Sequence, residues 1–116
     1  MKLNLYQNKV WVFNKAVDFR KSITGLVQIV SEHDEVELKQ GIFVFYNKQA
    51  TKVKIILWHK NGFIMLYKCI ANGKFLFEAD ESNTVKINED EFSWLLAGLP
   101  WQKMSTWGEL DYNKFS

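Results

Sequence analysis

Two stretches of the chain carry apolar residues at helical spacing. In the first, every third or fourth residue between Asp18 and Ser31 is apolar, which indicates one buried helix face. The second begins at Asn88, which is followed three residues later by Glu91 in the pattern of a capping box. We therefore predict helices over about 18–31, with Asp18 as the N-cap, and over about 88–98. The expected buried stripes are Phe19, Ile23, Leu26, Val27 and Val30, and Phe92, Leu95, Leu96 and Leu99.

The segment 41–77 has the pattern of a sheet. Apolar runs rich in β-favouring residues are separated by polar turns, and the pairs Asn61-Gly62 and Asn72-Gly73 are typical of two-residue hairpin turns. This predicts an antiparallel meander of about four strands. Its expected strands are residues 42–46, 53–58, 63–68 and 74–77. Shorter strands are predicted at 10–13 and 84–87, and residues 32–40 read as a loop.

These elements indicate one α+β domain in which two amphipathic helices pack on an antiparallel meander. The chain has 116 residues, which is too short for two well-cored domains. We expect the domain to span 1–116, with its core at about 10–102 and an irregular tail at 103–116. Since the aromatic share is 16%, some aromatic side chains should remain outside the core. Those expected to fill it are Phe43, Phe45, Phe63, Tyr67, Phe75 and Phe77.

Composition narrows the chemistry further. The one cysteine, Cys69, excludes an internal disulfide and suits a reducing cytoplasm, where we expect the protein to act; we predict that Cys69 is packed. His33 and His59 are isolated in the sequence, so no metal site is expected. No Gly-rich phosphate loop, signal peptide or membrane-length apolar run is recognised, so we expect no cofactor and no membrane contact.

Charge is segregated along the chain. The net charge is only +2, yet residues 38–77 contain seven lysines and no acid, while residues 79–116 carry an excess of acids. The lysines could keep the sheet soluble and prevent its edge strands from pairing with other chains. They could instead form a basic face for phosphates, or meet the acidic C-terminal part within one chain or between self-associating copies. Because the predicted sheet lacks acids, and a helix cap accounts for Asp18, we expect no catalytic residues and no enzyme.

Three blocks of the chain resemble one protein family. They are V-D-F-R-K at 17–21 followed by Gly25-Leu26, the sheet block from Phe43 to Phe75, and Leu95–Leu99 with Trp101. In order and spacing they resemble the accessory proteins encoded by the second open reading frame of insertion sequences of the sixty-six class. The resemblance covers about residues 10–102. It departs from the family pattern at Gln49, His59 and Cys69.

The resemblance implies a non-catalytic role in DNA transposition beside a separate transposase. It maps the family's polar block onto Asp18, Arg20 and Lys21, and its basic meander onto Lys48, Lys52, Lys54 and Lys68. Lys60 joins this set because it shares a face with Lys52 and Lys54 if the strand runs straight. A strict two-residue turn at Asn61-Gly62 pairs Lys54 with Cys69 and puts Lys68 on the opposite face. The predicted nucleic-acid-binding residues are therefore Arg20, Lys21, Lys48, Lys52, Lys54, Lys60 and Lys68.

Two function classes remain open from the sequence. In one, the protein binds DNA weakly through its lysines and works with the transposase. In the other, it is a protein–protein adaptor that recruits or regulates the transposase without contacting DNA. Periodicity places Tyr46, Trp58 and Trp94 off the main stripes, where they could stack on single-stranded bases or line a second core or protein interface.

Overall fold

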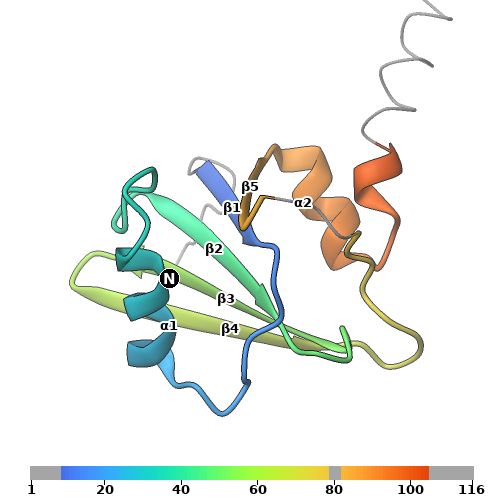
Figure 1. Ribbon diagram of the computed structural model, residues 1–116, viewed down its shortest axis with the longest axis horizontal. Helices are drawn as coiled ribbons and strands as arrows, with labels where there is room; N and C mark the ends of the chain where they lie inside the picture. Colours follow the sequence, from blue (N-terminus) through green and yellow to red (C-terminus); the bar gives the residue numbers. More distant parts are fainter. Residues whose placement is uncertain (1–8, 79–81, 105–116) are drawn as a thin grey trace, which may run out of the picture.

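A computed structural model of the chain describes residues 9–78 and 82–104. Along the chain, a strand and a helix are followed by four strands and a second helix (Figure 1). Their bounds are β1 (Lys9–Phe13), α1 (Ile23–Ser31), β2 (Gly41–Tyr46), β3 (Lys52–His59), β4 (Gly62–Cys69), β5 (Thr84–Ile87) and α2 (Glu89–Leu96).

The strands form one five-stranded sheet in the order β4-β3-β2-β1-β5. The antiparallel pairing of β2 with β3 and of β3 with β4 confirms three strands of the predicted meander. The predicted fourth strand at 74–77 is wrong. That segment leaves the sheet. The Phe75 amide donates to the Ala50 carbonyl at 2.7 Å, and the Phe75 ring inserts into the core.

The sheet is mixed, not wholly antiparallel as predicted. β1 pairs parallel with β2 and antiparallel with β5. The chain between β1 and β2 contains α1, and a helical crossover of this kind is what a parallel pair requires. Strands β1 and β5 lie where the sequence predicts strands, but pairing between strands so distant in sequence leaves no local signature.

The β3–β4 turn differs from the predicted one by one position. His59 pairs with Gly62, and Lys60, with φ 53°, lies within the turn. Lys54 therefore pairs with Tyr67 and not with Cys69, a register shift of two residues. Because side chains alternate with a period of two, this shift keeps every side chain on its predicted face.

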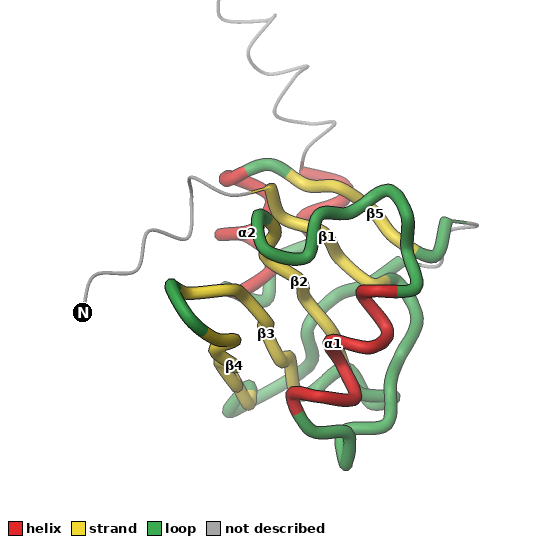
Figure 2. Tube along the Cα trace, turned by 90° about the vertical axis from the view of Figure 1, so that its left-hand side faces the viewer, coloured by secondary structure: helices red, strands yellow, loops and turns green. Residues whose placement is uncertain are grey.

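Apolar side chains cover both faces of the sheet. One face packs against Leu26 and Val30 of α1, and the other against Phe92 and Leu95 of α2 together with Trp101. In Figure 2 the two helices accordingly lie on opposite sides of the strands. Apolar residues of β1 to β4 alternate between the two cores, whereas β5 contributes Val85 and Ile87 to the α2-side core alone. The alternation explains the nearly continuous apolar run of β2.

The two helices begin in different ways. The capping box at α2 is confirmed, with the Asn88 side chain accepting from the Glu91 amide and the Glu91 side chain accepting from the Asn88 amide. The predicted start of α1 is wrong, since the helix begins at Ile23 and its N-cap is Ser22. Asp18 lies before the helix. Its carboxylate accepts hydrogen bonds from Arg20 in a local turn, and therefore does not cap the helix.

Two further expectations need correction. Cys69 is exposed at the end of the edge strand β4 and is not packed. Residues 101–104 are helical, so the predicted irregular tail does not begin at 103. Trp101 is buried, and its indole N–H donates to the Leu76 carbonyl at 2.7 Å. Residues 105–116 lie outside the described residues. Across 9–78 and 82–104, no helix has the length and apolarity needed to cross a bilayer.

Replacing Gly41 by Ala is expected to lower the free energy of unfolding by about 1–3 kcal/mol, because overpacking a dense core forces side chains from their rotamers. An added Cβ would lie 2.5 Å from Cζ of the fully buried Phe43 ring. Gly62→Ala is the matched control, since no atom lies within 4 Å of its Cβ position. Denaturant unfolding measures both; equal loss in the two variants would contradict the packing explanation.

Candidate nucleic-acid interface

The buried ammonium group of Lys54 connects the sheet to the chain that precedes α1. Lys54 lies on the α1 face of β3 and is only 5% exposed. Its Nζ donates to the carbonyls of Phe19, at 2.8 Å, and Lys21, at 3.1 Å. Burying an ammonium group is costly unless it is hydrogen-bonded. These two bonds therefore stabilise the 19–21 segment beside the sheet.

Aromatic rings complete the surroundings of this ammonium group. Lys54 Nζ lies 4.8 Å from the ring centroid of Phe19 and 5.7 Å from that of Tyr67, both within the range of cation–π attraction. The two rings meet edge to face at 6.0 Å. Lys54, Phe19 and Tyr67 thus form one packed group at the outer end of the sheet.

The β2–β3 loop is organised by the buried side chain of Asn47. Its Oδ1 accepts from the amides of Thr51, at 2.9 Å, and Lys52, at 3.0 Å, while its Nδ2 donates to Gln49 Oε1 and Thr51 Oγ1. Ala50, with φ 56°, turns the chain back. The side chains of Lys48 and Gln49 project from this loop and are exposed.

The segment before α1 also bonds directly to the end of β2, because the Val17 amide donates to the Tyr46 carbonyl at 2.9 Å. Between this segment and the β2–β3 loop lies an open cavity of about 420 Å³, which we call the basic groove. Its lining residues are Val17, Asp18, Phe19, Arg20, Asn47, Lys48, Gln49, Lys52 and Tyr67. Three cations and one carboxylate therefore face the same space.

The carboxylate of the groove is paired. Asp18 accepts the Nε and Nη2 hydrogens of Arg20, the shortest contact being 2.6 Å, and also the Arg20 backbone amide at 2.9 Å. The side-chain hydrogen bond to Arg20, followed by the backbone bond, lowers the pKa of Asp18 from 3.8 to about 2. The same pair raises the pKa of Arg20. Both groups are therefore ionised at neutral pH.

The predicted binding residues separate into groups. Arg20, Lys48 and Lys52 line the basic groove, and Lys21 is exposed beside it. Lys54 does not line the groove; it is buried, and its ammonium group bonds the carbonyls of Phe19 and Lys21. Lys60 is in the β3–β4 turn, about 25 Å along the strand from Lys52 at the usual rise per residue. Lys68 lies on the opposite face, as predicted, where its Nζ donates to the Leu96 carbonyl at the end of α2.

Tyr67 is a groove residue that the sequence analysis assigned to the core. It is 50% exposed, on the edge strand β4, next to the cations of the groove. The three aromatic residues singled out from periodicity are differently placed. Tyr46 stacks on Phe77 at 3.8 Å, Trp58 contacts Phe63 and the Lys39 ammonium, and Trp94 packs on the α2-side core. A β3–β4 turn predicted at residues 60–61 would have paired Tyr67 with Lys54, as the structure does.

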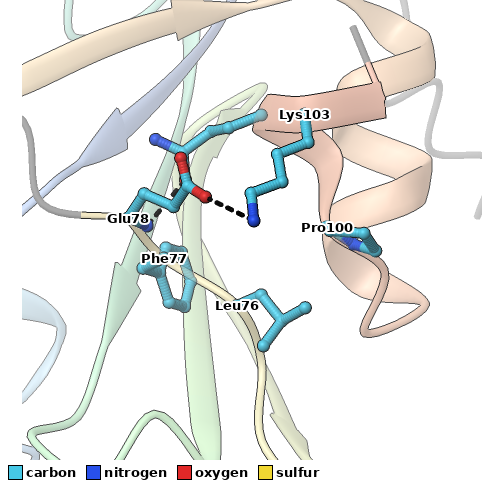
Figure 3. A pocket seen from close by; sticks show the side chains of 6 residues that line it. Leu76, Phe77, Glu78, Pro100 and Lys103 are labelled. Carbon is cyan, nitrogen blue, oxygen red and sulfur yellow. Dashed lines mark hydrogen bonds and ion pairs between the residues drawn. The ribbon is translucent and has the colours of Figure 1, made fainter. Parts of the chain in front are cut away.

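A second, smaller cavity of about 180 Å³ lies on the α2 side (Figure 3). It separates the segment 76–78 from residues 100–103, and Glu78 joins its two walls by an ion pair with Lys103 at 3.5 Å and a backbone hydrogen bond to Gln102. Leu76 at its edge is among the exposed large apolar side chains, as is Leu99. This cavity is largely apolar in its lining, in contrast to the basic groove.

Metal ligands do not gather anywhere in the described part of the chain. Within 9–78 and 82–104, no three His, Cys, Asp or Glu side chains are close enough to hold an ion. His33 lies against the Phe13 ring, and His59 is at the end of β3.

Comparison with known proteins identifies the family. A model of the IS66 Orf2-like proteins matches residues 8–106. The chain belongs to the IS66 Orf2-like family. It is similar to two curated proteins of Sinorhizobium fredii, y4jC and y4hO, with identities of 33% over 97 residues and 26% over 101 residues. The first alignment covers 83% of both chains, and the second covers 85% of this chain and 88% of the relative. No solved structure matches the chain.

The resemblance to the IS66 accessory proteins is thereby confirmed. Two of the blocks that carry it meet at the basic groove. The V-D-F-R-K block supplies residues 17–20 to one wall, and Asn47, within the second block, holds the loop that supplies the other. Groove residues 27 or more positions apart in sequence are thus brought together by the Lys54 hydrogen bonds and the pairing of Val17 with Tyr46.

The depressed pKa of Asp18 gives a prediction for acid. Because the folded-state pKa is about 2 and the ordinary value is 3.8, the pair stabilises the fold fully above pH 3.8 and loses this effect as pH falls toward 2. Carbon-detected NMR of the Asp18 carboxyl should give a midpoint near 2. In Arg20→Gln the midpoint should rise toward 3.8, because the largest cause is removed. An unchanged midpoint in that variant would contradict the assignment.

Proposed function

We propose that this IS66 Orf2-like protein is a non-catalytic accessory protein that acts in DNA transposition with a separate transposase, and that its basic groove binds the phosphate backbone of DNA. Family membership supports the accessory role in an insertion sequence. The observation that carries the DNA-binding part is the convergence of Arg20, Lys48 and Lys52 on one open groove.

The chemistry of the groove suits phosphate. Lysines act as flexible point charges toward phosphate oxygens, and a guanidinium adds planar donors. Arg20 is already paired with Asp18, so a phosphate entering the groove replaces or shares the carboxylate as the partner of Arg20. The rest of the lining consists of side-chain amides, two aromatic rings and Val17, none of which carries a charge that would repel an anion.

Binding by this chain alone should be weak and largely independent of sequence. The net charge is only +2, and the acid-rich part after residue 79 opposes a polyanion. Affinities near the usual non-specific range of about 10⁻⁴ to 10⁻⁶ M at physiological salt are expected. We assign sequence specificity and strand chemistry to the transposase, because the groove holds a single carboxylate and that carboxylate is paired with Arg20.

Reversing two groove charges should abolish DNA retention. We expect Lys48→Glu/Lys52→Glu to weaken binding at least tenfold at low salt and to reduce the slope of log affinity against log salt by about 1 to 2, since each lost phosphate contact removes about one released counterion. Fluorescence anisotropy with labelled element-end DNA at several salt concentrations measures both quantities. Lys54 is left intact because it is buried.

The matched control is Lys9→Glu/Lys86→Glu, which changes the net charge equally. These two lysines are exposed on β1 and β5, at the end of the sheet where β2 begins and away from the β2–β3 loop. The control should retain most of the parent affinity. Equal losses in the two variants would show that net charge alone matters, and a parent chain that fails to bind at low salt would refute the proposal.

A second candidate function, the protein–protein adaptor, is favoured by the exposed apolar edge of the smaller cavity. Leu76 lines this cavity and Leu99 directly precedes Pro100 of its other wall, and exposed apolar side chains are typical of protein contacts. In this case co-purification of the element's transposase should change little with salt, fall severalfold in Leu76→Gln, and persist in Lys48→Glu/Lys52→Glu. The opposite pattern would exclude the adaptor.

A further inference from the structure

Tyr67 is an exposed aromatic side chain surrounded by cations. It lies on β4, the edge of the sheet, where it is 50% exposed and lines the basic groove. Lys52 and Lys48 belong to the same groove, as does Arg20 on the opposite wall. A ring in such a position has apolar surface that no residue of the described chain covers fully, next to groups suited to a phosphate backbone.

The ring is also held in place from behind. Phe19 contacts it edge to face at 6.0 Å, and Lys54 Nζ lies 5.7 Å from its centroid. Lys54 is fixed in turn by the carbonyls of Phe19 and Lys21. A ring supported in this way loses little conformational freedom when a ligand stacks on it, which favours binding.

Resting on the proposed function, we propose that the basic groove prefers single-stranded DNA to duplex DNA, and that Tyr67 is the residue on which a base stacks. The bases of a duplex are stacked on one another and present only their edges, whereas those of a single strand are free to stack on an aromatic side chain. Cations flanking an exposed ring are the combination found at sequence-tolerant single-strand sites.

Charge and ring position together favour this occupant. The lining of the groove has a net positive charge, which repels a cationic ligand and attracts the phosphates of a nucleic-acid backbone. The side-chain amide of Gln49 and the loop held by Asn47 provide hydrogen-bond donors and acceptors, but not an arrangement that matches the edge of one particular base. Binding of bases without sequence preference follows from such a lining.

The competing aromatic candidates are less suited. The ring of Tyr46 is stacked on Phe77 with an interplanar angle of 10°, so that face is taken. Trp58 has the Lys39 ammonium 4.5 Å from its centroid and the Phe63 edge beside it, at the other end of β3. Tyr67, in contrast, is exposed and lines the same groove as Arg20, Lys48 and Lys52.

The test compares an oligothymidylate with a duplex of equal length, using fluorescence anisotropy of the full chain at low salt. The parent should bind the single strand about tenfold more tightly than the duplex. Tyr67→Ala should lose about tenfold for the single strand, the lower part of the range for one stacked base, and little for the duplex. Tyr67→Phe should behave as the parent, because it keeps the ring.

Folding is monitored by thermal unfolding of each variant. If Tyr67→Ala unfolds, Tyr67→Leu replaces it, since Leu keeps apolar bulk on β4 but offers no aromatic face. Retention of single-strand affinity in the folded variant would overturn the role of Tyr67. Equal binding of both DNA forms by the parent would overturn the preference while the proposed function stands. Failure of the parent to bind either form at low salt would refute both.

Discussion

The groove depends on one interaction, the capture of two backbone carbonyls by the Lys54 ammonium group. Its two hydrogen bonds draw the carbonyls of Phe19 and Lys21 onto β3, while the Val17 amide bonds the start of the same segment to β2. An ammonium group placed under apolar rings must have such partners, because an unsatisfied buried charge is very costly. The need to satisfy this one side chain therefore places the backbone of residues 19–21, and with it the backbone of Arg20, beside the sheet.

Two apolar cores make that placement rigid. β3 contributes Ile55 to one core and Ile56 to the other, so neither face of the strand is free to slip. A register shift of one residue would exchange the two faces along the whole strand, and would move Lys54 away from α1. The register that buries the apolar residues is thus also the register that forms the groove.

Local sequence signals predicted most elements but not how they assemble. The Asn88 capping box and the three meander strands are specified by neighbouring residues, so pattern and spacing suffice to find them. The parallel β1–β2 pair depends on contacts across a helical crossover, and the loss of the strand at 74–77 depends on a core site for Phe75. For the same reason the sequence located Arg20 and Lys48 as candidates but could not bring them together, and it assigned the exposed Tyr67 to the core.

A run of lysines without acids is therefore a poor guide to a charged surface. Lys54 and Lys68 lie on opposite faces of the sheet, yet both donate to backbone carbonyls, one before α1 and one at the end of α2. A cation at a helix C-terminus interacts favourably with the carbonyls that have no partner in the helix. Lys54 joins the segment before α1 to the sheet, Lys68 joins the end of α2 to it, and Lys60 belongs to a distant turn. The positive field that remains for a ligand comes from the loop lysines and from Arg20, and it is concentrated where an exposed ring adjoins it. A compact chain of small net charge can in this way present a local site that its overall composition does not suggest.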